Sequence, residues 1–317
     1  MRPKLRTTRL SGMTQTASPF CPLADGRPLS KRRRFSAFVK ILFAMFLVCG
    51  TFVAGGYYVL TRVEPITAEP EIETLCRLDL SDGTYSLEVE QAMSATTVGG
   101  VAFSMDLPPE AVTVAYATVW QETAFYNLEY GDRDSLGLFQ QRPSQEWGDP
   151  EEILDPVYAS HAFYDALVEV DGWEDRPVFE AAQAVQRSAD GFAYDQHEKL
   201  SQRMNEVFTG TRGPGLTCWY APEALAALTG AEADVPGAEQ ELARVFGVEP
   251  AALAEAPEAA TGDRGWAMAL WAVAHAEQYG LTSVAYNDRV WRASDGTSGA
   301  AEWQSGTFDT RGGLVLG

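Results

Sequence analysis

The sequence predicts a mainly α-helical protein with one transmembrane helix near its N-terminus and a small α/β module at its C-terminus. Three observations lead to this prediction: a long charge-free apolar stretch, helix-type spacing of apolar residues after it, and short strand patterns near the end. The chain has 317 residues, of which 46% are hydrophobic, so it can bury a core and has room for about two domains.

The apolar stretch covers residues 41–61 and contains no charged side chain. At about 1.5 Å per residue, such a helix spans the roughly 30 Å hydrocarbon core of a bilayer. The basic cluster Lys31–Arg34 precedes it, which places the N-terminus in the cytoplasm and the rest of the chain outside. A cleaved signal peptide is the alternative, but the run is longer than a typical signal-peptide core and lacks an obvious cleavage site.

The charge of the chain is unevenly distributed. Residues 1–40 carry ten Lys or Arg and one acid, whereas the remainder carries 14 basic and 43 acidic residues. An acidic external part repels nucleic acid, so we expect membrane lipid, and not nucleic acid, among the partners.

The expected organisation follows the composition along the chain. We predict the following segments: a basic cytoplasmic tail (1–40), a transmembrane helix (41–61), a tether (62–75), a helical domain (76–220), an Ala/Pro/Glu-rich linker with short helices (221–262) and a small α/β module (263–317).

Within the helical domain, apolar spacing and proline positions indicate five helices. They are expected from about 88 to 105, from Pro109 onward, and over 156–168, 178–188 and 195–208. In the C-terminal module we expect a helix over 266–279, which Gly280 ends, and strands over 283–286 and 290–291.

The four cysteines divide by compartment. Cys21 falls in the predicted cytoplasmic tail and Cys49 in the membrane, so Cys76 and Cys218 are the external pair. An oxidising exterior permits a disulfide between them. Two buried free thiols are the alternative.

Glu122 is the first candidate for chemistry. It stands at the end of the apolar helix that begins near Pro109, three residues after Val119 of the buried stripe. Partial desolvation raises the pKa of a carboxyl, and a general acid near neutral pH needs a raised pKa. A glutamate at a helix end is otherwise usually a solvated surface residue.

The segment that follows Glu122 favours a catalytic role over that of a solvated surface residue. Gln121-Glu122-Thr123 is followed by Ser135-Leu-Gly-Leu-Phe-Gln-Gln141. The pair of motifs resembles the lytic transglycosylase and goose-type lysozyme superfamily over roughly residues 88–208. There, a helix ends in a catalytic Glu within a Gln-Glu-Ser-like motif, and a Ser-x-Gly-Leu-Met-Gln-like segment lines the sugar groove. The chain also resembles actinobacterial single-pass membrane proteins that share the Gly-Leu-Phe-Gln-Gln-Arg-Pro run.

The resemblance implies a lysozyme-like fold and cleavage of peptidoglycan glycan strands, with Glu122 as general acid and then base. It implies that substrate is bound by Ser135, Gly137, Phe139, Gln140 and Gln141. The later Tyr-Asn pair of the superfamily is absent, and we expect Tyr194 to take the stacking role. A non-catalytic cell-wall binding or scaffold protein on the same fold is the alternative, since fold does not imply activity.

Other acidic, aromatic and histidine residues are weaker candidates for a functional role. Asp132 and Asp134 are the available second acids for a hydrolase, but a role in turn formation and pairing with Arg133 or Arg142 suits them better. Five aromatic residues near the motifs are candidates for sugar stacking: Tyr126, Tyr130, Phe139, Trp147 and Tyr194. His161, His197 and His275 lack metal-ligand spacing, so we expect no metal or other cofactor.

Overall fold

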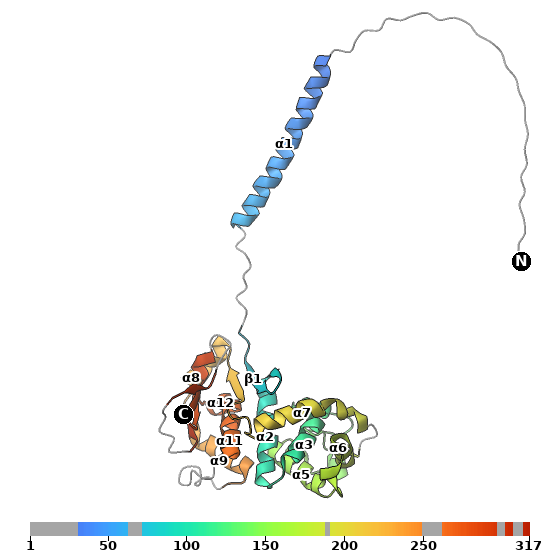
Figure 1. The fold of residues 1–317 in the computed structure, drawn as a ribbon, viewed down its shortest axis with the longest axis vertical. Coiled ribbons are helices and arrows are strands. Elements are labelled where there is room, and N and C mark those ends of the chain that lie inside the picture. Colours follow the sequence, from blue (N-terminus) through green and yellow to red (C-terminus); the bar gives the residue numbers. More distant parts are fainter. Residues whose placement is uncertain (1–30, 63–71, 188–190, 249–261, 297–301, 307–312) are drawn as a thin grey trace, which may run out of the picture. The chain divides into compact units, whose positions relative to one another are not determined.

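The computed structural model describes residues 31–62, 72–187, 191–248, 262–296, 302–306 and 313–317, and these residues are mainly helical (Figure 1). Contacts divide the chain into two units, Met1–Glu69 and Pro70–Gly317, which are described separately. Cys21 and most of the predicted basic tail lie outside the described residues, as does most of the predicted tether.

In the first unit, helix α1 covers Lys31–Arg62. Its stretch Ser36–Tyr58 has a mean hydropathy of 2.3 over 23 residues, so by length and composition it could cross a membrane. The observed helix begins ten residues before the predicted span, because the basic cluster at its start continues in helical geometry. Large apolar side chains such as Phe46 and Phe52 are exposed along it.

The second unit begins with a small antiparallel sheet in the order β2-β1-β3. Its strands are β1 (Leu75–Leu80), β2 (Gly83–Leu87) and β3 (Leu216–Trp219). The sequence analysis missed this sheet. The signal was present in β1, where Cys76, Leu78 and Leu80 alternate with less buried residues.

A disulfide joins Cys76 to Cys218, as predicted. The two residues are direct partners in the β1–β3 ladder, and the bond closes a sequence separation of 142 residues. It therefore ties the first strand of the unit to the strand that follows the last predicted helix of the helical domain.

Replacing Cys76 and Cys218 together by Ser should lower the free energy of unfolding by about 2–4 kcal/mol, because the unfolded chain loses a long-range constraint. Denaturant unfolding of the full chain in detergent measures this loss. Cys49→Ser is the matched control, since Cys49 is exposed and unpaired. Equal unfolding midpoints for the double variant and this control would contradict the stabilising role.

The helices predicted for the helical domain are confirmed. They are α2 (Val89–Ser104), α3 (Pro109–Glu122), α5 (Pro156–Val168), α6 (Val178–Gln186) and α7 (Asp195–Phe208), with the short α4 (Pro150–Ile153) before α5. Ser188, the predicted end of α6, lies outside the described residues. Proline in the first turn begins α3, α4 and α5, as expected for a residue that lacks a backbone N–H.

Helix α2 lies at the centre of the unit, between α3, α5 and α7 on one side and α9 (Val235–Phe246) and α11 (Gly262–Ala274) on the other (Figure 1). Two glycines allow these close approaches. A Cβ on Gly99 would lie 2.7 Å from the hydroxyl of Tyr116, and one on Gly100 would lie 2.5 Å from Val245. The small residues of α2 therefore let two groups of helices pack on opposite faces of it.

The predicted linker contains two helices, α8 (Pro222–Gly230) and α9 (Val235–Phe246), and its last part, residues 249–261, lies outside the described residues. The helix predicted over 266–279 begins at Gly262 and is divided at His275 into α11 (Gly262–Ala274) and α12 (Ala276–Tyr279). The strands β4 (Ser283–Tyr286) and β5 (Arg289–Arg292) agree with the prediction. With β6 (Gln304–Ser305) and β7 (Val315–Leu316) they form a sheet in the order β6-β5-β4-β7.

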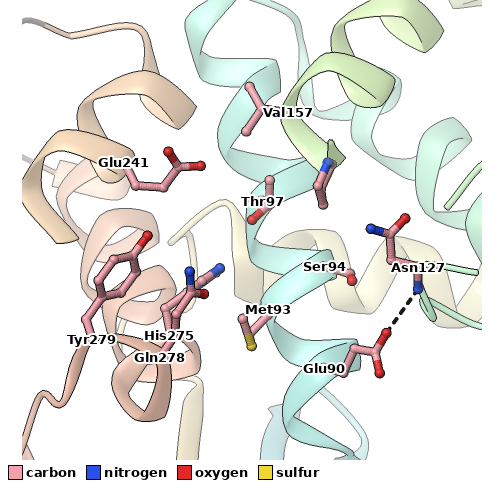
Figure 2. A pocket seen from close by; sticks show the side chains of 11 residues that line it. Glu90, Met93, Ser94, Thr97, Asn127, Val157, Glu241, His275, Gln278 and Tyr279 are labelled. Carbon is pink, nitrogen blue, oxygen red and sulfur yellow. Dashed lines mark hydrogen bonds between the residues drawn. The ribbon is translucent and has the colours of Figure 1, made fainter. Parts of the chain in front are cut away.

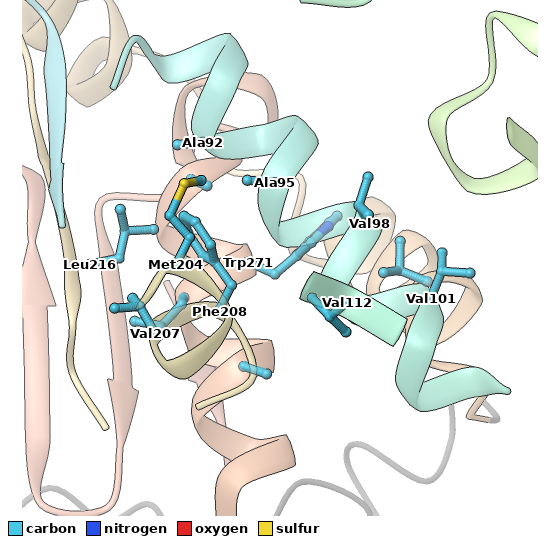
Figure 3. Packing of buried hydrophobic residues seen from close by; sticks show 14 of the residues in the cluster. Ala92, Ala95, Val98, Val101, Val112, Met204, Val207, Phe208, Leu216 and Trp271 are labelled. Carbon is cyan, nitrogen blue, oxygen red and sulfur yellow. The ribbon is translucent and has the colours of Figure 1, made fainter. Parts of the chain in front are cut away.

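Residues 263–317, for which we predicted a small α/β module, lie in one unit with the helical domain. Trp271 of α11 is fully buried and donates from its indole nitrogen to the hydroxyl of Thr97 on α2, at 3.2 Å. Figure 3 shows Trp271 beside residues of α2 and α7 in one apolar cluster. Trp291 and Trp303 donate to the backbone of β3 in the same way, at Cys218 and Leu216. The aromatic residues of the C-terminal segment thus complete the core of the helical domain.

Candidate active site

Glu122 is the last residue of α3, as the sequence predicted. The chain reverses immediately afterwards, because Ala124 and Phe125 both adopt positive φ angles, 51° and 68°. The ring of Phe125 is fully buried and packs edge-on against Tyr116 and Trp120 of α3. The buried ring fixes the turn, and the turn fixes the end of the helix that carries Glu122.

The carboxyl of Glu122 is partly buried and is held by uncharged groups. The hydroxyl of Tyr194 donates to Oε1 at 2.8 Å, and Nε2 of Gln186 lies 3.4 Å from the same oxygen. Within the described part of the chain, Glu122 forms no ion pair. Burial raises the pKa of Glu122, and the two hydrogen bonds oppose that rise without cancelling it. The carboxyl can therefore keep its proton closer to neutral pH than an exposed glutamate can.

The second motif lies against the end of α3. The hydroxyl of Thr123 donates to the carbonyl oxygen of Leu138 at 2.9 Å. Nε2 of Gln186 also donates to the carbonyl oxygen of Phe139, at 2.7 Å, so one amide side chain contacts both the catalytic candidate and the motif. The structure thus brings together the two segments that the sequence analysis paired.

Most of the predicted substrate-binding side chains in this motif are buried: Ser135, Gly137, Phe139 and Gln141. Phe139 stacks on Phe163 with ring centroids 4.5 Å apart, and Nε2 of Gln141 donates to the carbonyl of Ala159 at 3.0 Å. Phe139 and Gln141 anchor the segment to α5, which leaves little of their side-chain surface for a ligand.

Gly137 and Gln140 shape the same segment. Gly137 has φ +73°, and a Cβ there would lie 2.5 Å from the carbonyl oxygen of Ile153, so no other residue fits without a shift of the backbone. Gln140 is partly exposed, and its Nε2 lies 3.3 Å from the carbonyl oxygens of Tyr130 and Gly137. Of the five predicted residues in this motif, Gln140 is the one with side-chain surface left for a ligand.

Tyr194 was expected to stack on a sugar ring, but its ring is only 2% exposed. Its hydroxyl points to Glu122 instead. In this structure the side chain therefore contacts the carboxyl and leaves little ring surface for stacking. Two residues earlier, Phe192 is 74% exposed and stacks on Phe179 at 5.1 Å.

Two features of the site were missed in the sequence. Gln186 has no motif of its own, and its only signal was its place at the end of the helix over 178–188. Phe192 lies in the Gly191-Phe-Ala-Tyr194 stretch, and an exposed aromatic residue cannot be distinguished there from a core residue without the fold. Among the other aromatic candidates, Tyr130 is exposed, while Tyr126 and Trp147 are partly buried.

The second acids serve the loop that precedes the motif. Asp134 accepts from Nε of Arg142 and from the backbone N–H of Ser144, both at 2.8 Å. The Ser144 hydroxyl and Arg142 hold the pKa of Asp134 well below its usual range. Asp132 is exposed, and its nearest cation is Arg133 at 3.9 Å. Asp134 is thus a structural carboxylate, which agrees with the turn role expected for it.

In the part of the chain that the structure describes, no group of three His, Cys, Asp or Glu side chains is placed to hold a metal ion. His197 contacts Oε1 of Gln121 through Nε2 at 3.1 Å, next to the candidate site.

Replacing Tyr194 by Phe removes the hydrogen bond that lowers the pKa of Glu122, so that pKa should rise further. A general acid with a higher pKa keeps its proton to higher pH, and the alkaline limb of the pH profile of glycan cleavage should move to higher pH. Tyr164→Phe is the control, because its buried hydroxyl donates to the carbonyl of Val98 on α2. A limb that moves equally in both variants, or in neither, would contradict this role.

Comparison with models of protein families gives no match for this chain, and a search of curated proteins gives none either.

Proposed function

We propose that this chain is a membrane-anchored extracytoplasmic enzyme with a lysozyme-like fold that cleaves peptidoglycan glycan strands. The bond cut is the β-1,4 bond between N-acetylmuramic acid and N-acetylglucosamine. Glu122 protonates the glycosidic oxygen as general acid and then serves as base. The proposal extends the resemblance of Gln121-Glu122-Thr123 and Ser135–Gln141 to the lytic transglycosylase superfamily.

The observation that carries the proposal is the environment of the Glu122 carboxyl. It is partly desolvated, it accepts from Tyr194 and Gln186, and it forms no ion pair in the described part of the chain. A carboxyl held by neutral donors can exchange a proton, whereas one locked to an arginine stays ionised.

The two candidate second carboxyls in the described loop before the motif favour an intramolecular route. Asp134 is bound to Arg142 and Ser144, and Asp132 lies in an exposed loop. Hydrolases of the common type need two carboxyls at a defined separation. In a transglycosylase, a hydroxyl of the sugar attacks C1 itself, and Glu122 accepts the proton of that hydroxyl. The product is then one water lighter than the product of hydrolysis.

Substrate contacts would come from the exposed aromatic residues near the site. Phe192 lies two residues from Tyr194 and is 74% exposed, so one face of its ring is open to a sugar while the ring stacks on Phe179. Together with Gln140, it replaces the buried residues first expected to bind the strand.

The second candidate function is a non-catalytic wall-binding protein. The missing Tyr-Asn pair favours it. Incubation of the purified chain with insoluble peptidoglycan separates the two. The enzyme releases soluble glycan fragments, whereas the binding protein sediments with the wall and releases none.

The proposed location makes a separate prediction. The basic cluster before α1 favours a cytoplasmic N-terminus, so an alkaline phosphatase reporter fused after Gly317 should be active. The same reporter fused before Met1 is the matched control and should be inactive. The opposite pattern would place the acidic unit in the cytoplasm, away from the proposed substrate.

A further inference from the structure

A cavity that Glu122 does not line lies beside α2. It has a volume of about 260 Å³ and is enclosed by α2, the start of α5, α9 and the α11–α12 junction (Figure 2). Its polar wall includes Glu90, Ser94, Thr97, Glu241, His275 and Tyr279. None of the lining residues is a lysine or an arginine, so acidic groups set the charge of the cavity.

His275 gives this cavity a fixed hydrogen-bond acceptor. Its ring is 6% exposed and is stacked on Trp271, with centroids 3.9 Å apart. Nδ1 lies 2.8 Å from the carbonyl oxygen of Trp271, and a carbonyl can only accept, so Nδ1 carries the proton. Nε2, on the opposite edge of the ring, is therefore an unprotonated acceptor. It has no hydrogen-bond partner among the described residues.

The two carboxylates of the cavity differ in whether a cation neutralises them. Both oxygens of Glu241 accept from Arg244, at 2.6 and 2.9 Å, and Arg244 also binds Asp155. Glu90 accepts from the backbone N–H of Asn127 at 3.1 Å and forms no ion pair in the described part of the chain. Glu90 is thus the charge that is left for a ligand.

We propose that this cavity binds a small primary amine that is free in solution. One N–H of its ammonium group donates to Nε2 of His275. Glu90 attracts the charge from across the cavity, beyond Met93, where its carboxylate is directed toward Asn127 (Figure 2). Burial lowers the pKa of His275 to about 3, so the ring stays neutral near pH 7 and does not repel a cation. A quaternary ammonium ion should bind more weakly, because it has no N–H to donate and the lining offers it only the phenol ring of Tyr279 for a cation–π contact. The site does not depend on the proposed glycan cleavage, because Glu122 does not line it.

The test uses three small probes with the full chain in detergent and ligand-observed NMR. Ethanolamine should bind with a Kd on the order of 1 mM, which is reasonable for a ligand of so few atoms. Choline keeps the charge without N–H donors, and ethylene glycol keeps the hydroxyl without the charge. Both should bind at least about tenfold more weakly. Equal binding of all three would overturn the proposal.

Variants locate the site. Glu90→Gln should weaken ethanolamine binding about tenfold, because it removes the charge at an exposed position in the first turn of α2. Glu110→Gln, in the exposed first turn of α3, is the matched control and should change nothing. His275→Phe keeps a ring against Trp271 and removes the acceptor, so a folded variant should also lose binding. If His275→Phe fails to fold, the comparison of Glu90→Gln with Glu110→Gln tests the site. Equal ethanolamine affinities of these two variants would refute it.

Discussion

Replacing Glu122 by Gln should reduce glycan cleavage by about 10²–10⁴-fold, toward the upper end of the range for general acid–base catalysis. The amide keeps the shape of the side chain and can still accept from Tyr194, but it can neither donate a carboxylic proton nor take one up. The loss should be large because the same carboxyl acts in both half-reactions. Release of soluble fragments from peptidoglycan measures it.

The stability of the Glu122→Gln variant provides the control for folding. Burial raises the pKa of Glu122, so folding favours the protonated form more than the unfolded chain does. A group with a raised pKa contributes stability that is complete below its unfolded pKa, roughly 4.3, and is lost as pH rises through the folded pKa. The neutral amide avoids this loss. At pH 7, Glu122→Gln should therefore melt at the wild-type temperature or above it.

Asp134→Asn is the control that tests whether loss of any carboxylate near the site abolishes cleavage. It also converts a carboxylate to an amide, but at a carboxylate that holds the loop through Arg142 and Ser144. Its effect on cleavage should be much smaller than that of Glu122→Gln. A loss as large as that of Glu122→Gln, in a folded protein, would indicate a two-carboxyl mechanism.

Replacing Trp271 by Ala should lower the free energy of unfolding by about 3–5 kcal/mol, as is usual when a fully buried tryptophan is removed. The substitution would leave a new cavity between α11 and α2, and the hydrogen bond to Thr97 would be lost. Because both sides share one core, we expect the whole unit to melt earlier in a single transition. Denaturant unfolding followed by far-ultraviolet circular dichroism measures this.

Trp147→Ala is the control for the loss of a tryptophan, since Trp147 is only partly buried. Its effect on stability should be smaller. Two separated transitions for Trp271→Ala, with the helices α3 and α7 unaffected, would show that the C-terminal residues fold independently of the helical domain.

The helices were predictable because their signals are local. A proline in the first turn and apolar residues at helical spacing placed α3 and α5 correctly. The sharing of one core was not predictable, because it depends on side chains far apart in the chain. Trp271 contacts Thr97 across 174 residues, and no pattern near either residue indicates the other.

The candidate site divides in the same way. Glu122 and the pairing of its motif with Ser135–Gln141 could be inferred from the sequence, and the structure brings these segments together. The burial of Phe139 and Tyr194 could not be inferred, because the sequence alone does not show whether an aromatic residue lies in a core or in a groove. Gln186 could be found only once the fold had placed α6 beside the end of α3.

The mass of the released fragments tests the central claim most directly. The purified chain is incubated with peptidoglycan, and the soluble products are analysed by mass spectrometry beside those of Glu122→Gln. The account predicts disaccharide fragments that are one water lighter than the hydrolysis products, and none from the variant. Fragments that carry the added water, equal release by Glu122→Gln, or no release by the wild type would each contradict it.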